Sequence, residues 1–177
     1  MVVPAVLNEI EQSGISMWIR DTDSVFGFYF ILLCHTIGLS LLVGANTIVD
    51  LRILGVSPDL PIKSLTWLFS IMWTGFWINA PTGLLLVTAY PTKTLTNPLF
   101  YIKLTLIGLA VLNMYNMKTR LFEGALSEAS ITSQGRKMAK YSLVLWVAAI
   151  TAGRLLAYTY KYLLYGVYAM VFFNAPK

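Results

Sequence analysis

Two long stretches of this chain are almost entirely hydrophobic, and they set its organisation. Residues 24–49 and 64–92 contain no Asp, Glu, Lys or Arg, and their one histidine is His35. Each stretch exceeds the roughly 20 residues with which a helix crosses about 30 Å of hydrocarbon. Two weaker stretches follow, interrupted by Lys103 and Arg154. The pattern predicts four membrane-spanning helices at about residues 24–50, 64–90, 98–117 and 141–160.

The segments outside these stretches are too short or too polar to cross a bilayer. Residues 4–20 mix Ile, Leu and Trp with Asn, Glu and Gln, which is typical of an interfacial helix. Residues 162–173 form a Tyr-rich tail that either prolongs the fourth helix or lies on the membrane surface. We therefore expect an all-α fold, in which residues 1–177 form one integral membrane domain: a four-helix bundle with an N-terminal interfacial helix.

The composition agrees with a membrane protein, because 57% of the residues are hydrophobic and only 12% are charged. A soluble domain carries about a quarter charged residues. The net charge of +5 comes mostly from bases that flank the hydrophobic stretches, so it requires no nucleic acid partner. Seven bases fall on the side that holds the links after the first and third spans, against four on the other side. The positive-inside rule then places both termini outside the cytoplasm.

Four polar residues share the outer half of this predicted bundle. At about 1.5 Å per residue from the outer span ends, Lys103 and Arg154 lie roughly 8 to 9 Å deep, and His35 and Asn79 roughly 16 Å deep. No acidic residue falls at these depths. Because a charge inside the membrane is costly unless it reaches water or binds an anion, the pattern predicts a site for an anionic ligand.

Haem b matches the chemistry of this set. His35 would be the metal ligand, and Lys103 and Arg154 would pair with the two propionates. Gly38, one turn after the histidine, would let the flat macrocycle approach the helix, and Asn79 would orient the imidazole. The aromatic lining would come from Trp73, Phe76, Trp77 and Tyr101. With one histidine and no methionine at its depth, the iron would be five-coordinate, bound to an uncharged neighbour or shared between subunits.

The same residues also allow an interpretation without a ligand. A histidine in a membrane helix can hydrogen-bond a neighbouring helix, Lys103 can extend its ammonium group to the surface, and Arg154 can reach Asp21 or Asp23. The chain has no hydrolase or phosphate-binding motif. The single Cys34 permits neither a disulfide within the chain nor a thiolate metal site. Whether the protein is an enzyme therefore stays open, although a redox role is compatible with the site.

Several short motifs follow one another along the chain: HTIG at 35–38, DLRILG at 50–55, FYIK at 100–103, then Trp146 and the pair 153–154. In this combination the sequence resembles a family of small uncharacterised bacterial inner-membrane proteins. That resemblance implies a four-helix inner-membrane fold and no particular activity. More loosely, a histidine in the first helical hairpin resembles the copper-resistance D group, but the further His and Met residues of a copper-handling protein are missing.

These observations lead to one principal hypothesis and two alternatives. The principal one is a small inner-membrane protein that binds haem b, or another anionic amphiphile, for redox chemistry or sensing. Its partners would be the lipid bilayer, a quinone or periplasmic redox partner, and a second copy of the chain or a larger complex. The first alternative is a structural or assembly subunit of a larger membrane complex. The second is an anion channel or carrier with Lys103 and Arg154 along its path.

Overall fold

The described part of the chain is mostly helical, with short turns between the helices. The computed structural model describes residues 5–21, 26–123 and 128–173, with side chains in 5–21, 26–123 and 133–159, and no strand occurs in these ranges. The four long helices are α3 (Phe28–Leu54), α4 (Leu68–Ala89), α6 (Pro98–Met117) and α7 (Glu128–Phe173). The short elements are α1 (Ala5–Glu11), α2 (Gly14–Asp21), the 3-10 helix η1 (Ile62–Leu65), α5 (Pro91–Leu95) and the π-helical turn η2 (Lys118–Phe122). The expected all-α fold is confirmed for these residues.

In the described part of the chain, three helical segments are long and apolar enough to cross a membrane: Phe28–Leu54, Pro98–Phe122 and Ser133–Thr159. Helix α4 has 22 residues and no charged side chain, but its Trp, Asn, Pro and Gly residues lower its mean hydropathy. It continues through Pro81 without a break in the helix. The second expected span, residues 64–90, thus corresponds to a long uncharged helix that lies outside this set of three.

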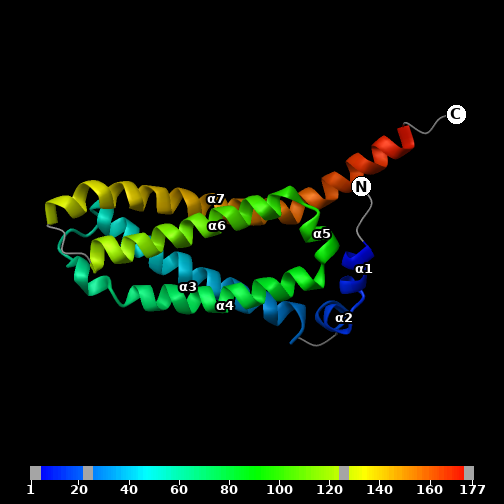
Figure 1. The fold of residues 1–177 in the computed structure, drawn as a ribbon, viewed down its shortest axis with the longest axis horizontal. Helices are drawn as coiled ribbons and strands as arrows, with labels where there is room; N and C mark the ends of the chain where they lie inside the picture. Colours follow the sequence, from blue (N-terminus) through cyan, green and yellow to red (C-terminus); the bar gives the residue numbers. More distant parts are fainter. Residues whose placement is uncertain (1–4, 22–25, 124–127, 174–177) are drawn as a thin grey trace.

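Some helix bounds differ from the expected ones. The interfacial helix expected over 4–20 is two short helices, α1 and α2, because the hydroxyl of Ser13 accepts from Ser16 N at 3.4 Å and so caps a new helix start. Helix α7 begins before residue 141 and continues to Phe173, so the Tyr-rich tail prolongs the fourth long helix. In Figure 1 this last part of α7 projects beyond the rest of the bundle.

The long helices form two hairpins, α3 with α4 and α6 with α7, which meet mainly through α3 and α7 (Figure 1). We call the end with the α3–α4 turn at residues 55–61 the turn end, and the opposite end the α5 end. At the turn end, Gly55 adopts a φ of 102° that terminates α3. The Arg52 guanidinium donates to the carbonyls of Pro58 and Leu60 and holds the turn against the helix.

Helices α1 and α2 pack against the α5 end, where they contact α4 and α5. The Ser16 hydroxyl donates to the carbonyl of Ala89 at 3.3 Å, and Ile19 is buried. Arg20 lies 3.0 Å from Asp21 and 3.8 Å from Glu11, and its hydrogen bond to Asp21 is the main reason why its pKa is raised. The outward side of helices α1 and α2 carries exposed apolar residues, which suits an interfacial position.

The hydrophobic core lies mostly near the turn end. Its large members come from all four long helices and include Leu42, Phe69, Met72, Met114 and Trp146. A second, small cluster at the α5 end contains Ile19, Ile31 and Ala89. Between the two clusters, the buried residue of α3 is Gly38, and α4 has no buried residue from 76 to 88. Few side chains of α3 and α4 are therefore fully buried over this intermediate stretch.

Helices α3 and α4 touch backbone to backbone at Gly38 and Gly75. A Cβ atom at Gly38 would lie 2.8 Å from Asn79 N, and one at Gly75 would lie 2.6 Å from Leu42 N. Backbone atoms cannot move aside as a flexible side chain can. Only glycine therefore allows this separation of the two helix axes, in the manner of small-residue contacts in membrane bundles.

This contact predicts a position-specific cost for adding a methyl group. Gly38→Ala and Gly75→Ala should each lower the unfolding free energy in detergent by about 1–3 kcal/mol, the usual range for overpacking. Gly108→Ala is the matched control on α6, since nothing lies within 4 Å of its added Cβ. Denaturant titration followed by circular dichroism measures the difference. Equal stability of the three variants would contradict the close contact.

Candidate functional site

His35 and Asn79 bind each other across the α3–α4 contact. The His35 Nδ1 atom lies 3.0 Å from the backbone oxygen of Asn79, and the Asn79 side-chain amide donates to the backbone oxygen of His35 at 2.8 Å. A carbonyl oxygen can only accept, so Nδ1 carries the proton and donates it. In the described part of the chain no group bonds to Nε2. The ring is thus fixed with its other nitrogen available.

Two further residues of α4 contact the imidazole ring or leave space for it. The Thr82 hydroxyl lies 3.2 Å from Nδ1 and also donates to the carbonyl of Ile78 at 2.7 Å. A Cβ atom at Gly83 would lie 3.0 Å from the His35 Cε1 atom, so the absence of a side chain there leaves room for the ring. Orientation of one ring nitrogen by a backbone carbonyl is the usual outer-shell arrangement of a metal-binding histidine.

Lys103 approaches the same region from the other hairpin. Its side chain runs along α7 at Gly153, where an added Cβ would lie 3.6 Å from Lys103 Cε and 3.8 Å from Nζ. The lysine is half-buried, and its charge acts on the His35 ring. Among the residues whose side chains are described, it has neither an ion pair nor a hydrogen bond. His35, Asn79 and Lys103 therefore gather in the stretch between the two core clusters.

The other residues expected at this site point elsewhere. The open face expected at Gly38 is covered by the backbone of α4, so a flat ligand has no access to it. Arg154 is exposed on α7, although the adjacent Gly153 faces Lys103. Trp77 is 66% exposed and Tyr101 54% exposed, so these rings lie on the outside of the bundle instead of lining a pocket around His35. The Tyr101 hydroxyl donates to the carbonyl of Leu95 at 2.9 Å.

A second polar cluster was not expected from the sequence. Asp50, at the expected end of the first span, is fully buried between α3 and α7. Arg52 binds the carbonyls of the α3–α4 turn, whereas Asp50 is hydrogen-bonded to Asn46 and Ser142. The available signal was the four-residue spacing of Asn46 and Asp50, which places both on one helix face. No group of three or more His, Cys, Asp or Glu side chains suited to a metal occurs among the described residues.

The hydrogen bond of His35 predicts its tautomer. Because the chain has a single histidine, nitrogen NMR of protein labelled with ¹⁵N-histidine reports on this ring alone. We expect a protonated Nδ1 and an unprotonated Nε2 in the protein without ligand. Asn79→Ala removes only the side-chain amide and keeps the carbonyl, so it should preserve the tautomer. A protonated Nε2 beside a bare Nδ1 would contradict the arrangement.

Comparisons with known proteins add no relative to this picture. No protein-family model, no curated protein and no solved structure matches the chain. The resemblance to small bacterial inner-membrane proteins therefore stays a prediction. The functional argument rests on the geometry of the residues themselves.

Proposed function

We propose that this protein is an integral membrane protein in which α3, α4, α6 and α7 all cross the bilayer as one four-helix domain. Support comes from the three long apolar segments and from the uncharged α4 packed along α3. Large apolar side chains also face outward on every long helix, for example Leu33, Leu84, Leu112 and Val144 at 55%, 69%, 55% and 66% exposure. Lipid would cover such a surface, which water would not tolerate.

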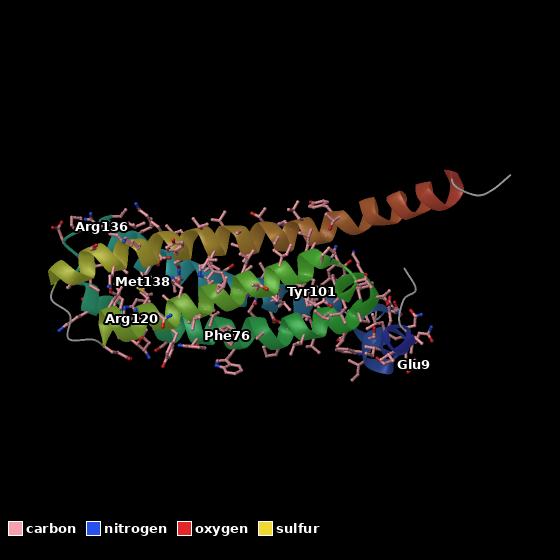
Figure 2. All side chains as sticks on the ribbon, turned by 45° about the horizontal axis from the view of Figure 1, so that its top comes forward. Glu9, Phe76, Tyr101, Arg120, Arg136 and Met138 are labelled. Carbon is pink, nitrogen blue, oxygen red and sulfur yellow. The ribbon has the colours of Figure 1, made fainter. Side chains whose placement is uncertain are left out.

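The proposed orientation puts the turn end in the cytoplasm. Figure 2 shows Arg120 and Arg136 at this end, where five further bases lie: Arg52, Lys63, Lys118, Lys137 and Lys140. By the positive-inside rule, the two termini are then periplasmic in a bacterial inner membrane. The His35 region falls in the outer half of the membrane, and Asp50 falls in the inner half.

The function that we propose is binding of haem b, or of another anionic amphiphile, for redox chemistry or sensing. One observation carries it: among the described residues, the Nε2 atom of His35 has no hydrogen-bond partner, and the nearby Lys103 ammonium group, from the other hairpin, has no counter-charge. A neutral Nε2 is a haem ligand, and a lysine can pair with a propionate. Bound haem would supply one-electron chemistry or binding of small gas molecules.

The proposal gives each residue near His35 a defined task. His35 would hold the iron through Nε2, while the carbonyl of Asn79 and the hydroxyl of Thr82 fix the ring. Lys103 would neutralise one propionate. Arg154 is exposed, so it is left out of the site, and the second propionate would face the aqueous side. Partners for electron exchange, such as a quinone or a periplasmic protein, would meet the bundle at its outer end.

The visible absorbance of the detergent-purified protein tests the cofactor. We expect a Soret band at near one haem per chain, present on purification or after adding haem, and lost in His35→Ala. Lys103→Met should raise the dissociation constant about tenfold, as expected for losing a charge-assisted contact of roughly 1.5 kcal/mol. Arg154→Met is the control of equal charge change and should bind like the wild type. A wild type without a Soret band under either condition would refute haem binding.

A specific surface feature favours the subunit alternative as a second candidate. Helices α6 and α7 form an apolar groove on the outside of the bundle, lined by Leu99, Ile102, Leu106, Val144, Val147 and Ala148. Such a groove would accept a helix of a larger membrane complex. Ala148→Phe would fill it, and should abolish co-purification of a larger complex if this candidate is right. A wild-type protein that purifies alone in mild detergent would speak against it.

A further inference from the structure

A carboxyl group lies at the centre of the contact between α3 and α7. Asp50, Asn46 and Ser142 have exposed fractions of 0%, 1% and 0%. The Asn46 amide donates to Asp50 Oδ2 and to the Ser142 hydroxyl, both at 2.6 Å. The Ser142 hydroxyl also hydrogen-bonds the Asp50 carboxyl group. The second carboxyl oxygen, Oδ1, is buried and has no hydrogen-bond partner in the described part of the chain.

No positive charge from the described side chains compensates this carboxyl group. Among the described residues, its interactions are those with Asn46 and Ser142, and no charged side chain acts on it. Arg52 binds the carbonyls of the α3–α4 turn, and Lys118 lies 3.3 Å from Glu123. Helix α4 has no charged residue, and the described part of α6 before Lys118 contributes only the distant Lys103. The remaining bases near this end are exposed on η1, η2 and α7: Lys63, Arg120, Arg136, Lys137 and Lys140.

An ionised carboxylate in this position would be costly. Moving a carboxylate out of water costs several kcal/mol even after relaxation, and two hydrogen bonds from neutral groups recover only part of that. A proton on the carboxyl group removes the charge and leaves Oδ2 free to accept from Asn46. The oxygen without a partner is the atom that can carry this proton.

We propose that Asp50 is a proton-binding site of this protein, neutral while α3 and α7 are in contact and able to release its proton to water at the turn end. On release, the proton passes from Oδ1 to a water molecule, and the remaining carboxylate keeps its bonds to Asn46 and Ser142. No other bond changes, and nothing is oxidised or reduced. The ligand of the site is the proton, so the site is independent of the haem proposal.

Infrared spectroscopy of the full-length protein in liposomes tests this assignment. A neutral carboxylic acid has a carbonyl stretch that is separate from the amide and carboxylate bands. We expect this band at neutral pH, and its reversible loss as the pH is raised. We also expect a shift to lower frequency in D2O, because the proton exchanges with water. Asp50→Asn should remove the band and keep the fold, since a carboxamide has the shape of the neutral acid.

A second variant keeps the test decisive if Asp50→Asn fails to fold. Ser142→Ala removes the hydroxyl group bonded to the carboxyl group, and should move the band without abolishing it. Asp59 and Glu123 are exposed acids on the same side and serve as controls, because their replacement by amides should leave the band unchanged. The proposal is overturned if the wild type lacks the band, if the band fails to shift in D2O, or if Ser142→Ala leaves its frequency unaltered.

Discussion

The close approach of α3 and α4 at Gly38 and Gly75 is the constraint on which the rest of this structure depends. It brings the two backbones near enough for Asn79 to bond with His35 in both directions. One hydrogen bond fixes the ring, and the other ties the amide to the neighbouring helix. A wider separation of the helices would leave these polar groups without partners in an apolar interior, where each would cost free energy.

Two ionisable groups, which have no counter-charge among the described side chains, occupy opposite halves of the interior. Lys103 lies near His35 toward the α5 end, and Asp50 lies toward the turn end. The densest part of the apolar core separates them, with Leu42, Met72 and Trp146 at its centre. Since an uncompensated charge is costly in an apolar interior, the charge of each group must be either paired or neutralised. We infer an anionic ligand for the lysine and a bound proton for the aspartate.

Much of this architecture could be predicted from the chain alone. Charge-free stretches locate the long helices, and counting residues from their ends places His35, Asn79 and Lys103 in one region. Depth does not give the direction in which a side chain leaves its helix. Arg154, Trp77 and Tyr101 have suitable depths but face outward, because packing of the two hairpins decides the rotation of each helix.

The burial of Asp50 was not predicted from the sequence, for a related reason. The expected first span ended at residue 50, whereas α3 continues to Leu54, and α7 begins well before the expected start of the fourth span. These extensions bury the carboxyl group between two helices instead of leaving it at a surface. They follow from tertiary packing, since neither Leu51–Leu54 nor the polar link before α7 is apolar enough by itself to mark a continued span.

Native mass spectrometry of the protein, released from membranes in mild detergent, tests the central claim that His35 and Lys103 hold an anionic amphiphile. We predict one bound species per chain in the wild type and in Arg154→Met, with the bound fraction strongly reduced in Lys103→Met and in His35→Ala. A bare wild-type chain would contradict the account. So would equal occupancy in all four proteins, because the bound species would then be lipid on the outer surface.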